Sequence, residues 1–207
     1  MIDQLRASGW RQSSIREPQR PDRRRELIGA AYNQIADHGF EGLRTRDVAA
    51  GAGVNVATLH YYFPTKESLI RGVVGHAMQR FTTTLSGEGT PAEQLRHHLH
   101  GVRRLFRDEP ELFAVMGELA LRSVRDPAIG AIFGDTSDAW HSRLRTLVGQ
   151  GVREGCLDAR LDPDEAAALI VAALKGTCMV PVTQSAPQRV DQTFRQLERW
   201  LGLPDSP

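Results

Sequence analysis

The sequence predicts an all-α protein, with a three-helix domain at its N-terminus and a larger helical bundle at its C-terminus. Three observations lead to this prediction. Apolar residues recur at intervals of three and four along most of the chain, as they do on one face of a helix. No segment alternates apolar and polar residues as a half-buried strand does. Several segments open on a capping residue or on a first-turn proline.

Four helices are expected in the first 85 residues. The first covers 23–38, where Leu27, Ala31 and Ile35 keep a helical spacing, and Gly39 is placed to end it in a left-handed turn. The next three each follow a residue that favours the N-cap position. They are 46–50 after Thr45, a short helix from Asn55 through Tyr62, and 66–85 after Thr65.

Five more helices are expected after the turn-forming segment 86–91. Their ranges are about 92–108, 110–124, 127–154, 163–182 and 188–202. Pro110 and Pro127 stand where the first turn of a helix tolerates proline. Asp162, Pro163 and Glu165 supply a cap, a first-turn proline and an acidic third residue to the fourth of them.

Composition narrows the class of protein. Of 207 residues, 41% are hydrophobic, which is enough for a core and excludes a wholly disordered chain. Lys and Arg number 26 against 25 Asp and Glu, a balance unlike that of proteins that coat nucleic acid without selectivity. No apolar run approaches the roughly 20 residues of a membrane span, and the N-terminus lacks the apolar core of a secretory signal. A cytoplasmic protein without a membrane partner is expected.

Three segments are expected: a basic N-terminal arm at 1–22, a small helical domain at 23–71, and a larger helical domain at 72–207. Seven arginines fall within the first 25 positions, and the stretch up to Pro21 has no helical or strand period. The arm is either a solvated leader or an additional source of phosphate contacts.

Segment 42–69 carries the most informative pattern. Two short helices joined by a glycine-containing turn of about four residues are typical of the helix-turn-helix motif. An ordinary helical corner has the same spacing. However, Val48, Ala49, Val54 and Leu59 already supply a core, so consecutive His60, Tyr61 and Tyr62 are not needed inside. The candidate DNA-binding residues are Thr45, Arg46, Asn55, Val56, Thr58, His60, Tyr61, Tyr62 and Lys66.

At these residues the sequence resembles the TetR family of transcriptional regulators. The family pattern is matched by Gly39-Phe40, by Thr45-Arg46-Asp47-Val48-Ala49, by Ala52-Gly53-Val54, by Thr58-Leu59-His60-Tyr61-Tyr62-Phe63 and by Lys66-Glu67-Ser68-Leu69. The match covers about residues 24–71 and is highly specific. Beyond residue 72 only the length and the helical layout are similar.

The resemblance implies that Thr45, Arg46, Thr58, His60, Tyr62 and Lys66 face DNA, whereas the equivalents of Asn55, Val56 and Tyr61 vary with operator sequence. His60 departs from the pattern, because the family most often has a phosphate-contacting tyrosine there. The resemblance also implies that 23–71 is a DNA-binding domain and that 72–207 is an effector-binding and dimerisation domain. The homodimer would bind a double-stranded operator and leave it when a small molecule binds the C-terminal domain. A repressor is the expected regulator.

The effector is expected to be hydrophobic or aromatic and to bind between the helices spanning about 92–154. That segment is rich in large apolar side chains and holds few polar groups, a composition that suits a small apolar ligand. Each of these residues taken singly is more often ordinary core. The candidate ligand-binding residues are His97, Phe106, Phe113, Met116, Trp140, His141 and Leu144.

The last two helices are expected to form the dimer interface. Helix 188–202 places Val190, Phe194, Leu197 and Leu201 on one stripe, and helix 163–182 is apolar almost all round, with Leu169 and Ala173 among its residues. An apolar surface of this extent needs cover. We expect both helices and their symmetry mates to form a four-helix interface.

No chemistry-bearing motif points to an enzyme. His97 and His100 have the spacing of a shared metal ligand pair, but no carboxylate or cysteine cluster completes a site, so no metal and no cofactor are expected. Cys156 and Cys178 are expected to be reduced, inert thiols. The alternative function is a helical small-molecule carrier or enzyme whose N-terminal corner is only structural.

Overall fold

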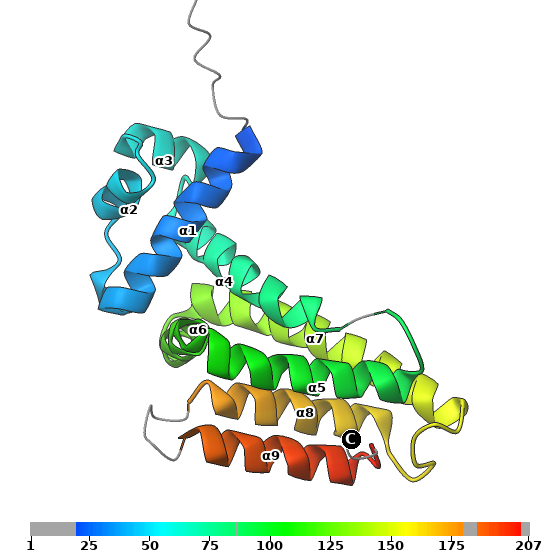
Figure 1. Cartoon of the computed structure of the whole chain (residues 1–207). Coiled ribbons are helices and arrows are strands. Elements are labelled where there is room, and N and C mark those ends of the chain that lie inside the picture. The colour runs from blue at the N-terminus through cyan, green and yellow to red at the C-terminus, as the bar shows by residue number, and fades with distance from the viewer. Residues whose placement is uncertain (1–19, 86, 180–185, 204–207) are drawn as a thin grey trace, which may run out of the picture.

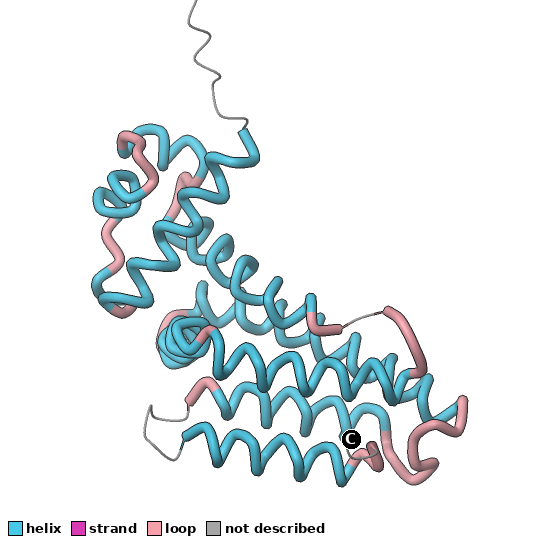
Figure 2. Tube along the Cα trace, viewed as in Figure 1, coloured by secondary structure: helices cyan, strands magenta, loops and turns pink. Residues whose placement is uncertain are grey.

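The computed structural model describes residues 20–85, 87–179 and 186–203, and all regular structure in those ranges is helical. The all-α prediction is confirmed. Figure 1 shows α1, α2 and α3 at one end of a layered bundle formed by α5 to α9, with α4 running from the small unit into the bundle. Short loops join most of the helices (Figure 2). The predicted arm, apart from its last residues, lies outside the described residues.

The N-terminal helices begin and end close to where the sequence places them. They are α1 (Arg20–His38), the 3-10 turn η1 (Phe40–Gly42), α2 (Thr45–Gly51), α3 (Val56–Tyr62) and α4 (Lys66–Thr83). Gly39 ends α1 with a φ of 69°, as predicted. Thr65 caps α4 in a reciprocal pair of bonds with Ser68. Thr45 was expected to cap α2, but it is the first helical residue, and the cap position belongs to Arg44.

The C-terminal bundle consists of α5 (Pro91–Asp108), α6 (Pro110–Ser123), α7 (Pro127–Arg153), α8 (Pro163–Thr177) and α9 (Ala186–Trp200). Asp162 Oδ1 accepts the backbone N–H groups of Asp164 and Glu165, both at 2.9 Å, and so opens α8 as expected. However, α8 does not continue to the predicted residue 182. It ends in tight turns in which Cys178 and Met179 donate to carbonyls three residues back, and 180–182 lie outside the described residues.

Helix α4 supplies one face to a core that serves both units. Its buried residues run along its whole length: Leu69, Ile70, Val73, Val74, Ala77, Met78 and Phe81. The helix packs on α1 near its start and on α5, α6 and α7 farther along. The predicted domain boundary at residue 71 therefore falls inside a continuous helix.

The apolar stripe of α9 packs inside its own protomer. Val190, Phe194, Leu197 and Leu201 are buried, Phe194 completely, and α9 lies against α5. Arg103 of α5 and Asp191 of α9 strengthen this contact with an ion pair of 2.9 Å. The prediction that these four residues cover a partner subunit is wrong, because a stripe of this kind needs cover but does not specify whose surface provides it.

A buried histidine ties α5 to the end of α4. The Thr84 hydroxyl donates to the Phe81 carbonyl at 2.6 Å, and its oxygen lies 2.6 Å from His98 Nδ1. Since the single hydroxyl proton is used, Nδ1 carries the imidazole proton and donates it to Thr84. His98 is fully buried, and that burial lowers its pKa from 6.5 to about 3. The folded protein therefore holds this imidazole neutral.

This burial predicts a pH-dependent stability. Between pH 6.5 and about 3 the unfolded chain binds a proton at His98 that the folded chain does not. The free energy of unfolding should therefore fall as the pH falls through this window, by up to about 1.4 kcal/mol per pH unit from this group. Denaturant titrations at pH 7, 6 and 5 should show a shallower pH slope in His98→Asn. The exposed neighbour supplies the control, His97→Asn, which should keep the wild-type slope; equal slopes in all three proteins would contradict the assignment.

Candidate nucleic-acid interface and ligand pocket

The turn between α2 and α3 is built by a glycine. Gly53 has a φ of 65° and donates to the Ala50 carbonyl at 3.0 Å, while the Val54 N–H reaches back to the Ala49 carbonyl at 2.9 Å. These two bonds are the Schellman arrangement that ends a helix, and the positive φ favours glycine at this position. Asn55 then starts α3 immediately. The turn is therefore as short as the sequence predicts for a helix-turn-helix motif.

One side of α3 is anchored, and the other side faces outward. Leu59 is buried together with Val48 and Ala49 of α2. His60 and Tyr61 are exposed, with 67% of Tyr61 accessible, and Ala57 is exposed beside them. Ala57 was not singled out from the sequence; its small side chain leaves room for a close approach of the backbone. An exposed polar and aromatic helix surface of this size fits a major groove of DNA.

Four of the candidate DNA-binding residues also make contacts within the protein. Asn55 caps α3, because its Oδ1 accepts the Thr58 N–H at 2.8 Å and the Thr58 hydroxyl at 3.0 Å. Val56 is partly buried against the core, and so is Tyr62, whose ring meets Tyr61 edge-on at 5.2 Å. These contacts fix the orientation of α3, and they leave His60 and Tyr61 as its most accessible large side chains.

Cations flank this surface at the starts of α2 and α4. Arg46 is exposed in the first turn of α2, next to half-buried Thr45. Lys66 is exposed at the start of α4, and its Nζ lies 4.5 Å from the centre of the Phe40 ring. Arg44, which the sequence analysis did not select, is exposed and donates to the Glu41 carbonyl. The arrangement can place several charge-assisted bonds on phosphates.

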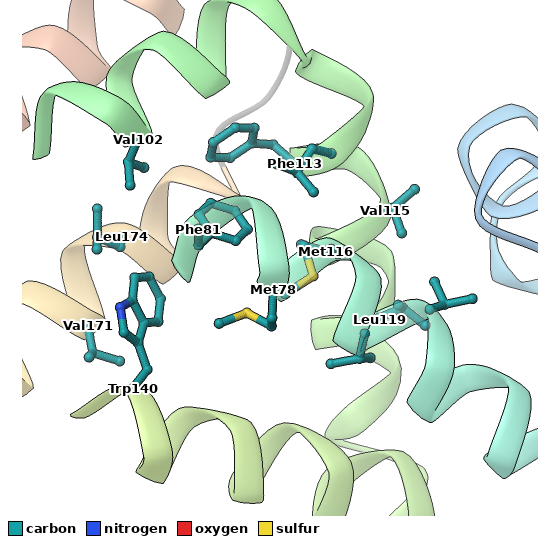
Figure 3. Close-up of a cluster of buried hydrophobic side chains, with 14 of the residues drawn as sticks. Met78, Phe81, Val102, Phe113, Val115, Met116, Leu119, Trp140, Val171 and Leu174 are labelled. Atoms are coloured by element: carbon teal, nitrogen blue, oxygen red, sulfur yellow. The ribbon is translucent and has the colours of Figure 1, made fainter. Parts of the chain in front are cut away.

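A largely apolar pocket lies in the bundle between α4, α6, α7 and α8. It encloses about 540 Å³, a volume typical of small-molecule sites. Figure 3 shows Met78 and Phe81 of α4, Met116 of α6 and Trp140 of α7 gathered around one region of the core. The other large apolar residues of its lining are Val74, Val124, Phe133, Leu174 and Met179.

Of the seven predicted ligand-binding residues, Met116 and Trp140 line this pocket. Phe113 and Leu144 are buried core residues, and Phe113 packs edge-on against Phe81 at 5.6 Å. His141 of α7 faces the start of α8, where its Nε2 lies 3.2 Å from the Asp164 carbonyl oxygen. The expectation that it lines the pocket is wrong, because it faces a different neighbour.

His97 and Phe106 line another hollow, a charged groove of about 550 Å³ between α5 and α9. Arg96, Arg103 and Arg104 also face this groove, so its chemistry differs from that of the apolar pocket. His100 lies there too, 3.0 Å from Glu198. The part of the chain that the structure describes holds no cluster of three or more His, Cys, Asp or Glu side chains that could bind a metal.

The polar groups of the apolar pocket are few. Ser123 and Thr136 donate their hydroxyl protons to carbonyls of their own helices, at 2.7 and 2.8 Å. Lys175 donates to the Ser137 hydroxyl at 2.6 Å. Burial raises the pKa of the Cys178 thiol to about 11, so this lining residue stays neutral at pH 7, in agreement with the expected inert thiol.

Helix α6 joins the pocket to the small unit. Its Met116 and Ala120 line the pocket, and its Glu118 and Arg122 reach η1. Glu118 Oε2 accepts the Phe40 N–H at 3.3 Å, and Arg122 Nη1 donates to Glu41 at 2.8 Å. The Arg122 guanidinium also lies 5.1 Å from the centre of the Phe40 ring. A displacement of α6 would therefore change contacts at η1 directly.

Known proteins match both parts of the chain. A family model described as bacterial regulatory proteins, tetR family, matches residues 27–73. A second one, described as BetI-type transcriptional repressor, C-terminal, matches 91–202. The HTH-type transcriptional dual regulator CecR of Shigella flexneri is 34% identical over 103 residues, which are 50% of this chain and 41% of that regulator.

Solved structures share the fold over nearly the whole chain. A putative TetR-family regulator from Rhodococcus sp. has a TM-score of 0.75 at 24% identity, covering 90% of this chain and all of that one. A putative regulator from Saccharomonospora viridis, solved in complex with choline, has a TM-score of 0.67 at 23% identity, covering 88% and 96%. With both family models matched and a helix-turn-helix face exposed, the chain belongs to the TetR family of transcriptional regulators.

Proposed function

We propose that this regulator is a repressor that binds a palindromic operator as a homodimer and is released by a small apolar molecule. The observation that carries the proposal is the pairing of an outward-facing α3 with an apolar pocket whose walls, α4 and α6, both pack on α1. The second family model, which describes a repressor, supports the direction of control. Such a protein acts where its DNA is, in the cytoplasm. Separately, none of the described helices is both long enough and apolar enough to cross a membrane.

The release mechanism rests on the two helices that the pocket and the small unit share. A ligand between α4, α6, α7 and α8 favours the bundle shape that gives it the better contacts. That shape must hold the two recognition helices at a spacing unsuited to DNA, because equal affinity for both shapes would shift nothing. A coupling of about 1–3 kcal/mol would lower operator affinity roughly 5–150-fold.

Choline, which the Saccharomonospora protein binds, is a poor candidate for this pocket. Trp140, Phe81 and Phe133 offer aromatic faces that suit a quaternary ammonium group. Among the described lining residues, however, the one formally charged side chain is Lys175, and a second cation beside it is repelled.

The alternative function, a carrier or enzyme whose N-terminal corner is only structural, has no comparable support, since the exposed α3 surface would then be unexplained.

The dimer interface is proposed on the outer face of α8 together with α9. Ala168, Leu169 and Ala172 are exposed along that face of α8, with Leu169 at 45%. Ala173 is partly buried against the core, so it stands at the edge of the face. Trp200 of α9 is also exposed. Small and apolar residues on one helix face allow a symmetry mate to approach closely.

DNA binding is tested first. Genomic fragments selected by the purified protein should carry a two-fold-related site whose half-sites are about 34–36 Å apart. Arg46→Ala should relax the sequence preference, whereas Lys66→Ala should weaken all duplexes similarly and lower the slope of log affinity against log salt by about one. The control is Arg145→Ala, an exposed arginine in the bundle. Equal affinity of the wild-type protein for selected and random DNA at physiological salt would refute specific recognition.

The dimer is tested on the exposed leucine of α8. Leu169→Arg should give monomers, because two guanidinium groups would be buried without partners in a two-fold interface. Sedimentation velocity at fixed protein concentration measures the outcome. Leu121→Arg changes a leucine of α6 that is 58% exposed and should stay dimeric. A dimeric Leu169→Arg protein would place the interface on another face.

The pocket is tested by filling it. A Cβ at Gly134 of α7 would meet no atom within 4 Å, and this glycine lines the pocket. Gly134→Leu should therefore fold, bind the operator as wild type does, and fail to release it when apolar metabolites are screened. Gly75 of α4 has equally open surroundings but does not line the pocket, so Gly75→Leu should keep the response. Release of the operator is measured by DNA-binding titration. If Gly134→Leu still releases it as the wild-type protein does, the effector binds elsewhere.

A further inference from the structure

The polar end of the apolar pocket is formed by Lys175 and Ser137. Lys175 stands in the last turn of α8, and its Nζ donates to the Ser137 Oγ on α7 at 2.6 Å. Lys175 is exposed, so this pair lies where the pocket opens to solvent. The remaining large lining residues are methionine, aromatic and aliphatic side chains.

Lys175 has no carboxylate partner. Among the described residues, no Asp or Glu forms an ion pair with its ammonium group, which donates to the Ser137 hydroxyl. Asp135, which is two residues before Ser137, is engaged by Arg71 at 3.2 Å. The charge of Lys175 is therefore available to a ligand.

This end of the pocket offers hydrogen-bond donors to a ligand. An ammonium group donates only, and it keeps two N–H bonds beyond the one given to Ser137. Ser137 accepts from Lys175, so its own hydroxyl proton can be donated as well. Ser123 and Thr136 have already donated their protons to backbone carbonyls. The end of the pocket that carries the charge therefore offers donors, which an anionic acceptor group satisfies and an ammonium group does not.

We propose that the effector is an amphipathic carboxylic acid, with its apolar body among Met78, Met116 and Trp140 and its carboxylate on Lys175 and Ser137. This inference rests on the proposed function, because it names the chemical class of ligand for the same pocket. A carboxylate is fully ionised at pH 7. Charge-assisted bonds to it gain strength beside an apolar wall, where the effective dielectric constant is lower than in water.

The experiment compares head groups on identical bodies. Hexanoate, octanoate and decanoate are titrated calorimetrically into the full-length protein, beside the matching 1-alcohols and alkyltrimethylammonium ions, all below their micelle concentrations. For the body length that fits best, the carboxylate should bind at least about tenfold more tightly than the alcohol, a difference of about 1.4 kcal/mol. The trimethylammonium compound should bind most weakly. An alcohol or ammonium compound that binds as tightly as the carboxylate would overturn the proposal.

Variants of the lysine assign the preference to its charge. Lys175→Met keeps a long apolar stem and should abolish the tenfold preference while leaving alcohol binding within about twofold of wild type. Lys175→Arg should keep the preference, because a guanidinium group also binds carboxylates. Arg145→Met removes an exposed cation elsewhere on α7 and should change nothing. A preference for carboxylates that survives in Lys175→Met would refute the role of Lys175.

The outcomes separate this inference from the proposed pocket. If alcohols bind and release the operator as well as carboxylates do, the anionic class is wrong and the apolar effector pocket stands. If no compound of the series binds, and Gly134→Leu still responds to an effector found by screening, both the pocket and the anionic class are wrong.

Discussion

Burial of one face of α4 in a core common to both units is the constraint on which the rest of the structure depends. Leu69 and Ile70 at its start pack with the small unit. Met78 and Phe81 near its end lie in the bundle and line the pocket. Because protein interiors are close-packed, a helix buried along its whole length does not bend freely between its two halves. The orientation of α3 is thereby tied to the packing of the bundle.

Helix α6 adds a second, polar connection to the small unit. Its Glu118 accepts the Phe40 N–H, and its Arg122 donates to the Glu41 carboxylate. The Phe40 ring is in cation–π contact with both Arg122 and Lys66. Exposed ion pairs of this kind contribute little to stability on their own. Their value here is geometric, since they relate a wall of the pocket to the loop directly before α2. Lys66 is therefore a candidate for a phosphate contact and also part of this contact between α4, α6 and η1.

The sequence was sufficient for features that depend on neighbours along the chain. Asn55, Thr65 and Asp162 cap helices as predicted, because a cap is a contact within three residues. It was insufficient where the contact partner is distant. The stripe on α9 is real, but whether α5 or a second subunit covers Phe194 is decided by the tertiary arrangement. For the same reason the pocket walls from α4 and α8 were missed, and His97 and His141 were assigned to a site that they do not face.

The position of the pocket within this core explains how a small ligand can influence α3. Side chains leave a space of about 540 Å³ between the helices that also hold the small unit, so the dispersion contacts that a ligand makes there depend on how α4 and α6 are placed. The groove between α5 and α9 is of similar size, but its described lining residues belong to α5 and α9, whereas α4 and α6 both pack on α1. Binding energy in the groove therefore lacks the direct route to α3 that binding energy in the pocket has. The same imperfect packing that makes room for a ligand is what allows the preferred placement of α4 and α6 to depend on that ligand.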